Sequence, residues 1–158
     1  MARGYCYEIC SDKEDIWSLS ETDLYKYAGH EFDYVSNLAS EDSIEETTGF
    51  AEMLKNCGAE VIDVTNDNRD NAYRVVFAKD TKLRYFSQRF TSLKKLAAEI
   101  TAEQFFEDSM ELYNLRKAIT EPYGDMVYLD SSLYDLDWFI RNAEVGKEYY
   151  IGNAVLIH

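Results

Sequence analysis

Histidine and cysteine, which most often carry metal or nucleophilic chemistry, are few and poorly spaced in this sequence. The histidines are His30 and the terminal His158, and the cysteines are Cys6, Cys10 and Cys57. There is no Cys-x-x-Cys pair, and Cys6 and Cys10 stand four residues apart on one predicted strand, which separates them by about 13 Å. That distance is too long for one ion or one disulfide. We therefore predict buried structural thiols, no metal site and no cofactor.

Two further patterns for chemistry are incomplete. The Asn/Asp-rich run 66–71 offers oxygen ligands, but it lacks the glycine and the closing glutamate of a calcium loop. The sequence has no Gly-x-Ser-x-Gly elbow and no glycine-rich phosphate loop, and His30 is the only internal histidine available as a base. We expect a solvated turn at 66–71 and no enzymatic activity. A small enzyme that uses carboxylates and tyrosines is the third of three hypotheses.

Carboxylates are the most abundant reactive groups, with 30 acids against 16 basic residues and a net charge of −14. At this density, close acidic pairs arise by chance and do not indicate acid-base catalysis. One set is regularly spaced: Glu103, Glu107 and Glu111 share one face of a predicted helix, about 6 Å apart at each step, and Asp108 lies beside them. We expect the apolar residues on both sides of this face, Phe106 among them, to be buried.

A ridge of carboxylates at this separation has a spacing similar to that of phosphates along a nucleic-acid strand. A second acidic group lies near the start of another predicted helix and comprises Glu41, Asp42, Glu45 and Glu46. Together the two groups predict a surface that a nucleic-acid-binding protein would accept in place of a phosphate backbone. The alternative is a solvated surface that only keeps the protein soluble.

Positive charge is concentrated between residues 74 and 98, where seven basic residues and one acid give +6, against −12 before this stretch and −8 after it. A heptad-like stripe predicts a core helix over 81–100, formed by Leu83, Phe86, Phe90, Leu93, Ala97 and Ile100. Basic residues interleaved with an aromatic are typical of nucleic-acid binding, and the candidates are Lys82, Arg84, Arg89, Lys94, Lys95 and Tyr85. Internal pairing with the flanking acids is the simpler interpretation. Association of copies through unlike charged surfaces is a further hypothesis.

The remaining elements follow from alternation, capping boxes and glycines. We predict strands over 4–10, 61–64, 73–78, 126–129 and 148–157, the last kinked or turned at 152–153, and a helical turn within 31–39. Three helices are predicted by capping boxes and end near residues 29, 58 and 119; the boxes are Ser18 with Glu21, Ser43 with Glu46 and Thr101 with Gln104. A further helix is predicted to have Ser131 or Ser132 as its N-cap. The 61–78 hairpin favours an α+β fold, with a mixed, largely antiparallel sheet of about 4–6 strands and 4–5 helices.

The length of 158 residues and the apolar fraction of 46% fit a single globular domain over 1–158. No apolar run is long enough for a membrane span, so we expect no membrane association. The odd cysteine count fits a reducing compartment, and we expect a cytoplasmic protein.

No family motif is recognisable. In size, acidity and lack of catalytic signatures, the chain resembles small acidic inhibitors encoded by mobile elements, the anti-CRISPR and anti-restriction proteins. This is a resemblance of physical type that covers no alignable stretch. It implies a non-enzymatic protein that mimics nucleic acid and blocks the basic surface of a bacterial defence nuclease. The second hypothesis is a regulatory or nucleic-acid-binding module that acts through the basic helix; direct binding of nucleic acid is the weaker expectation.

Overall fold

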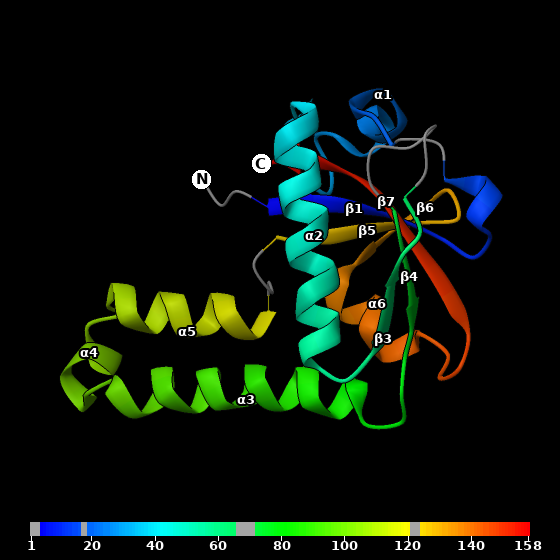
Figure 1. Cartoon of the computed structure of the whole chain (residues 1–158). Helices are drawn as coiled ribbons and strands as arrows, with labels where there is room; N and C mark the ends of the chain where they lie inside the picture. Colours follow the sequence, from blue (N-terminus) through cyan, green and yellow to red (C-terminus); the bar gives the residue numbers. More distant parts are fainter. Residues whose placement is uncertain (1–3, 17–18, 66–71, 121–123) are drawn as a thin grey trace.

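One mixed sheet forms the centre of the computed structural model, which describes residues 4–16, 19–65, 72–120 and 124–158 (Figure 1). Its strand order is β3-β4-β7-β1-β5-β6, with β2 added beside β7. The strands are β1 (Gly4–Cys10), β2 (Val35–Asn37), β3 (Glu60–Asp63), β4 (Tyr73–Val76), β5 (Met126–Leu129), β6 (Ser132–Asp135) and β7 (Glu148–Ile157). Among the described strand pairs, β1 with β5 is parallel and the others are antiparallel. The α+β prediction is confirmed, with seven strands among the described residues rather than four to six.

The long strand β7 organises this sheet. Along one edge it pairs with β1, and along the other it pairs with β4 through residues 148–151 and with β2 through residues 155–157. It is one continuous strand with an irregularity, because Gly152 and Asn153 together stand opposite Glu8. A Cβ on Gly152 would collide with the Glu8 carboxylate, so glycine is required at this position.

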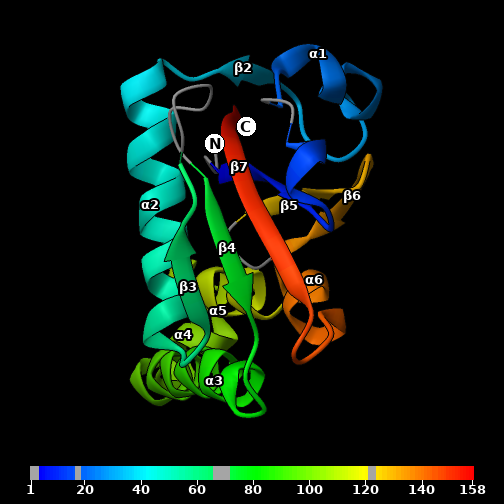
Figure 2. The same ribbon diagram turned by 45° about the vertical axis from the view of Figure 1, so that its right-hand side comes forward.

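Helices and short turns cover the two faces of the sheet. Alternation along β1 sends Tyr7 and Ile9 to one face, where they pack with α2 (Ser40–Asn56) and α6 (Leu136–Asn142) in the main core. Cys6 points to the other face and packs with the region of α1 (Glu21–Leu24) and the 3₁₀ turn η2 (Tyr25–Tyr27). Cys10 packs with Ile16, which directly follows the 3₁₀ turn η1 (Lys13–Asp15). Figure 2 shows α2 running alongside β3 and β4.

Three helices form a projection from this body, which we call the helical arm (residues 81–120). It consists of α3 (Thr81–Glu99), α4 (Ala102–Phe106) and α5 (Met110–Thr120). Figure 1 shows α3 and α5 side by side, extending away from the sheet, with α4 joining them at the far end. The described part of the chain therefore has six α-helices rather than four or five. None of its helices combines the length and apolar character needed to cross a bilayer.

Several predicted boundaries were wrong. Within 31–39 the chain forms β2 rather than a helical turn, because it pairs with the distant end of β7. The first helix starts at Glu21, and Asp23 accepts the Ser20 N–H at 2.8 Å, so the box lies two residues later than predicted; Ser18 lies outside the described residues.

The second and last predicted helix starts also differ. Helix α2 begins at Ser40, and Ser43 lies buried inside it, where its hydroxyl bonds to Asn153 on β7. The segment after Ser131 forms β6 before α6 begins at Leu136. Leu136 and Ile140 of α6 and its C-terminal neighbour Ala143 are buried.

Candidate protein-binding site on the helical arm

The predicted helix from 101 to 119 is broken in two. Its start is as predicted, because Thr101 accepts the Gln104 N–H at 3.2 Å and Gln104 accepts the Thr101 N–H at 3.0 Å. The helix ends at Phe106, Asp108 takes a positive φ of 51°, and a new helix begins at Met110. Ser109 starts this second helix through the hydrogen bond from the Leu112 N–H to its hydroxyl, at 3.4 Å. The polar run 107–109 is the sequence signal for this break.

The break changes how the arm acids are arranged. Glu103 lies in the first turn of α4 and Glu111 in the first turn of α5, so they do not form a ridge along one continuous helix. Each meets the positive end of its own helix, which favours a carboxylate. Glu103, Glu107 and Glu111 are exposed, and no ion pair joins them to another described residue. Asp108 differs, because it pairs with Arg116 at 2.8 Å.

Apolar side chains at the end of the arm are exposed rather than buried as predicted. Phe105 is 66% exposed, Phe106 89% and Met110 68%. We call these three residues the apolar tip. They belong to α4 and to the first residue of α5, the same segment that carries Glu103 and Glu107. Exposed large apolar groups that lie close together mark interaction sites more often than scattered single ones do, and aromatic and Met side chains are enriched in interfaces.

The second predicted acidic group does not join the first. Glu41, Asp42, Glu45 and Glu46 lie in the first two turns of α2, at the end of that helix far from the arm (Figure 1). The helix is 17 residues long, which separates its ends by about 25 Å. Glu46 is half-buried and the other three are exposed. The structure therefore holds two separate acidic groups rather than one surface.

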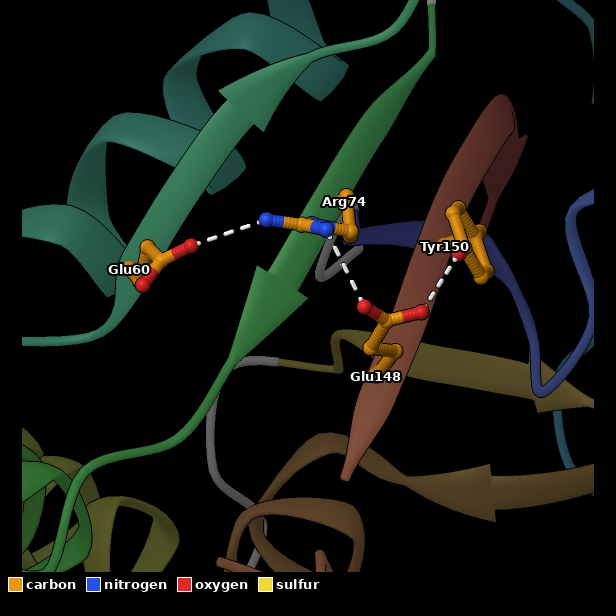
Figure 3. Close-up of polar contacts among 4 residues, drawn as sticks. All are labelled: Glu60, Arg74, Glu148 and Tyr150. Atoms are coloured by element: carbon orange, nitrogen blue, oxygen red, sulfur yellow. Dashed lines mark hydrogen bonds and ion pairs between the residues drawn. The ribbon is translucent and has the colours of Figure 1, made fainter. Parts of the chain in front are cut away.

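The basic stretch is largely engaged within the molecule. At its start, Arg74 on β4 bridges Glu60 on β3 at 2.9 Å and Glu148 on β7 at 3.0 Å (Figure 3). Tyr150 completes this cluster by donating its hydroxyl hydrogen to Glu148 at 2.8 Å, and this bond raises the pKa of Tyr150. Arg74 is thus part of a cross-strand network.

Several basic residues of α3 also have partners. Arg84 pairs with Asp80 at 2.8 Å, and Lys82 donates to the Arg141 carbonyl at 2.9 Å. Lys94 lies over the Phe90 ring, 4.9 Å from its centroid. Lys95 is exposed on the same helix. The predicted internal pairing therefore accounts for much of the positive charge.

Arg89 and Tyr85 hold the arm to the body. Arg89 pairs with Asp137 on α6 and donates to the Ala118 carbonyl on α5 at 2.9 Å. Tyr85 donates to the other oxygen of Asp137 at 2.9 Å, and burial raises the pKa of Tyr85. These two candidates for nucleic-acid contact therefore face α5 and α6, so the Tyr85 hydroxyl and the Arg89 guanidinium are engaged internally.

The predicted face of α3 is buried only in part, because Phe86, Leu93 and Ile100 of the stripe are half-buried. The predicted core stripe includes Leu83 and Phe90, which are 71% and 61% exposed, whereas the Arg89 side chain is only 17% exposed. Because Arg89 binds Asp137 on α6 and the Ala118 carbonyl on α5, the side of α3 that carries Arg89 faces these two helices. One side of the apolar stripe is left facing outward.

A cavity of about 780 Å³ is lined by residues of β1, η1, α1 and β5 and of the segments next to them. Its lining includes Glu8, Asp23, Asp130 and Tyr128, a set that bears on the enzyme hypothesis. Each of the three acids accepts a hydrogen bond from a backbone N–H. Glu8 accepts from Asn153 at 3.0 Å, Asp23 from Ser20 at 2.8 Å and Asp130 from Ser11 at 2.9 Å. These carboxylates therefore hold the local backbone in place.

The cysteines are buried as predicted. Cys6, Cys10 and Cys57 are free thiols at most 5% exposed, and burial raises the pKa of Cys6 and Cys57. Within the described ranges, no group of three or more His, Cys, Asp and Glu residues is arranged to hold a metal ion. The Asn/Asp-rich run 66–71 lies outside the described residues.

Comparison of the chain with protein-family models, with curated proteins and with solved structures finds no match in any of the three.

Proposed function

We propose that this protein is a non-enzymatic protein-binding module that uses the end of its helical arm to occupy a basic surface on a nucleic-acid-handling protein. Inhibition of a bacterial defence nuclease, as anti-CRISPR and anti-restriction proteins achieve it, is the specific role we propose. The free thiols support action in a reducing compartment, the cytoplasm.

The observation that carries the proposal is the combination of charge and apolar surface at one end of the arm. Glu103, Glu107 and Glu111 have no ion pair among the described residues, and Phe106 is 89% exposed beside them. Carboxylates attract a cationic partner and speed the encounter, while buried aromatic side chains supply most of the affinity at interface centres. A net charge of −14 strengthens the attraction to a basic partner.

The test is an affinity capture from a nuclease-treated bacterial lysate, followed by a nucleic-acid-binding assay on the captured protein. Wild-type protein should capture a basic partner and block its binding to nucleic acid. The triple variant E103K/E107K/E111K should do neither.

The matched control is E31K/D33K/E52K, which makes the same change in net charge at exposed acids outside the arm. This control should behave like the wild type. Equal loss of binding in both variants would show that only overall charge matters, and equal retention would remove the arm acids from the site.

A further inference from the structure

One aromatic ring of the apolar tip is flanked by two carboxylates. Glu103, Phe106 and Glu107 occupy positions i, i+3 and i+4, and the Glu107 N–H donates to the Glu103 carbonyl at 2.8 Å, so all three belong to one helical turn. The two glutamates are therefore about 6 Å apart along the axis. All three side chains are exposed, Phe106 at 89%, and no described residue forms an ion pair with either glutamate. Phe106 thus presents a ring to solvent with a negative charge before and after it along the turn.

This arrangement has the features of an unpaired nucleotide. Along a single strand each base lies between two phosphates, and proteins that bind such strands stack the bases on aromatic side chains in a positively charged groove. In a duplex the bases are paired and stacked, and the phosphate backbone supplies most of the contacts. The break at residues 107–109 ends the regular row of carboxylates that would imitate that backbone, and it leaves an aromatic ring beside the acids instead. The arm therefore fits a single-strand site better than a duplex site.

A second exposed phenylalanine of the arm lacks this arrangement. Phe90 on α3 is 61% exposed, but Lys94 lies over its ring, 4.9 Å from the centroid. A cation at this position repels the positively charged groove in which nucleic acid binds. Phe90 therefore offers a control, because it is an exposed ring of the same type on the same arm with the opposite charge beside it.

We propose that the end of the arm occupies the site in which its partner binds single-stranded nucleic acid. Phe106 takes the place of a base, and Glu103 and Glu107 take the places of the phosphates on either side of it. The partner surface is then a positively charged groove that carries aromatic side chains for stacking. This inference rests on the proposed function, because it names the kind of basic surface that the arm covers.

The first test separates stacking from the simple burial of apolar surface. F106Y keeps an aromatic ring, whereas F106L keeps the apolar character and loses the ring. For the captured partner, F106Y should stay within about threefold of the wild-type affinity, F106L should bind at least about tenfold more weakly, and the control F90L should match the wild type. Both positions are mostly exposed, so the thermal midpoints should agree. F106L as tight as the wild type, or F106Y as weak as F106L, would overturn the proposal.

The second test uses labelled probes on the captured partner: oligothymidine and oligouridine of about 20 nucleotides, and a hairpin duplex of the same length. The wild type should displace at least one of the single strands, which also tells DNA from RNA, and F106L should displace it poorly. A partner that binds only the duplex, or that releases only the duplex to the wild type, would overturn this inference and leave the proposed function standing. Failure to capture any basic partner would contradict the proposed function itself, and this inference with it.

Discussion

Arg89 and Asp137 form an ion pair that joins the helical arm to the body of the protein, with side chains only 17% and 8% exposed. Asp137 also accepts the Tyr85 hydroxyl hydrogen, so both of its oxygens are engaged by α3. Because the arm carries the proposed binding surface, this connection determines how that surface is presented.

Removing one partner of this pair should destabilise the protein strongly. In R89M the Asp137 carboxylate stays buried without its cation, which costs about 3 kcal/mol. Urea unfolding measures the loss. The control R84M removes the exposed pair with Asp80, at 57% and 52% exposure, and should cost less than about 1 kcal/mol. Similar losses in the two variants would contradict the assignment of Arg89 as the anchor.

Two glycines should respond to alanine with opposite signs. At Gly152 a Cβ would collide with the Glu8 carboxylate and the Ile16 side chain, so G152A should lose about 2 kcal/mol or more. At Gly49, inside α2, a Cβ meets no atom within 4 Å, so G49A should gain about 0.5–1 kcal/mol. Chemical denaturation of both variants checks the signs. An unchanged G152A would contradict the close approach of Glu8 to β7.

Asp125 should make stability fall as the pH rises above 4. Burial raises the pKa of Asp125 above its ordinary value of 3.8, so the folded state holds this proton more tightly than the unfolded state. Its contribution is complete below 3.8 and is lost as the pH rises through the folded pKa. In the structure the Tyr5 N–H donates to Asp125 Oδ1 at 2.8 Å. The amide of D125N can still accept this hydrogen bond, but it does not titrate. Relative to D125N, the wild type should lose stability as the pH rises above about 4, and parallel curves would contradict this.

The three thiols should be unreactive in the folded protein. Cys6, Cys10 and Cys57 are at most 5% exposed, and the raised pKa of Cys6 and Cys57 disfavours the thiolate that attacks disulfide reagents. Ellman's reagent should therefore label them only after denaturation. Fast labelling of one thiol without denaturant would show that its surroundings open easily.

Phe106 should contribute to partner binding and little to stability. At 89% exposure it loses almost no burial when truncated, so F106A should keep the thermal midpoint of the wild type. If Phe106 enters a pocket on the partner, the same change should weaken the complex by about 2 kcal/mol, or about thirtyfold. Calorimetric titration of the captured partner gives the affinity, and an unchanged value would leave the carboxylates as the whole site.

The elements predicted correctly are those whose formation depends on residues close together in the sequence. Alternation placed the first strand, the Asn/Asp-rich turn between branched residues indicated the hairpin of β3 and β4, and the Thr101 box marked the start of α4. The burial of Cys6 and Cys10 was also predicted correctly, because their spacing along β1 is too long for one ion or one disulfide.

Elements that depend on distant partners could not be predicted in this way. The segment Val35–Asn37 is a strand because it pairs with residues 155–157 at the end of β7. The sequence around residues 35–37 has no periodicity that predicts this distant pairing. Helix α3 had an unambiguous apolar stripe, yet Asp137 on α6 and the Ala118 carbonyl on α5 drew Arg89 inward and left Phe90 outside. The acids of the arm were found from their spacing, but the apolar tip was missed because the helix break after Phe106 was not anticipated.

The most direct test of the account is the affinity of the purified, captured partner for three proteins: the wild type, E103K/E107K/E111K and E31K/D33K/E52K. We predict that the arm triple weakens the complex at least a hundredfold, that the control triple changes it less than fivefold, and that the thermal midpoints agree. Equal affinities for the two triples would contradict the claim that the end of the helical arm is the binding site.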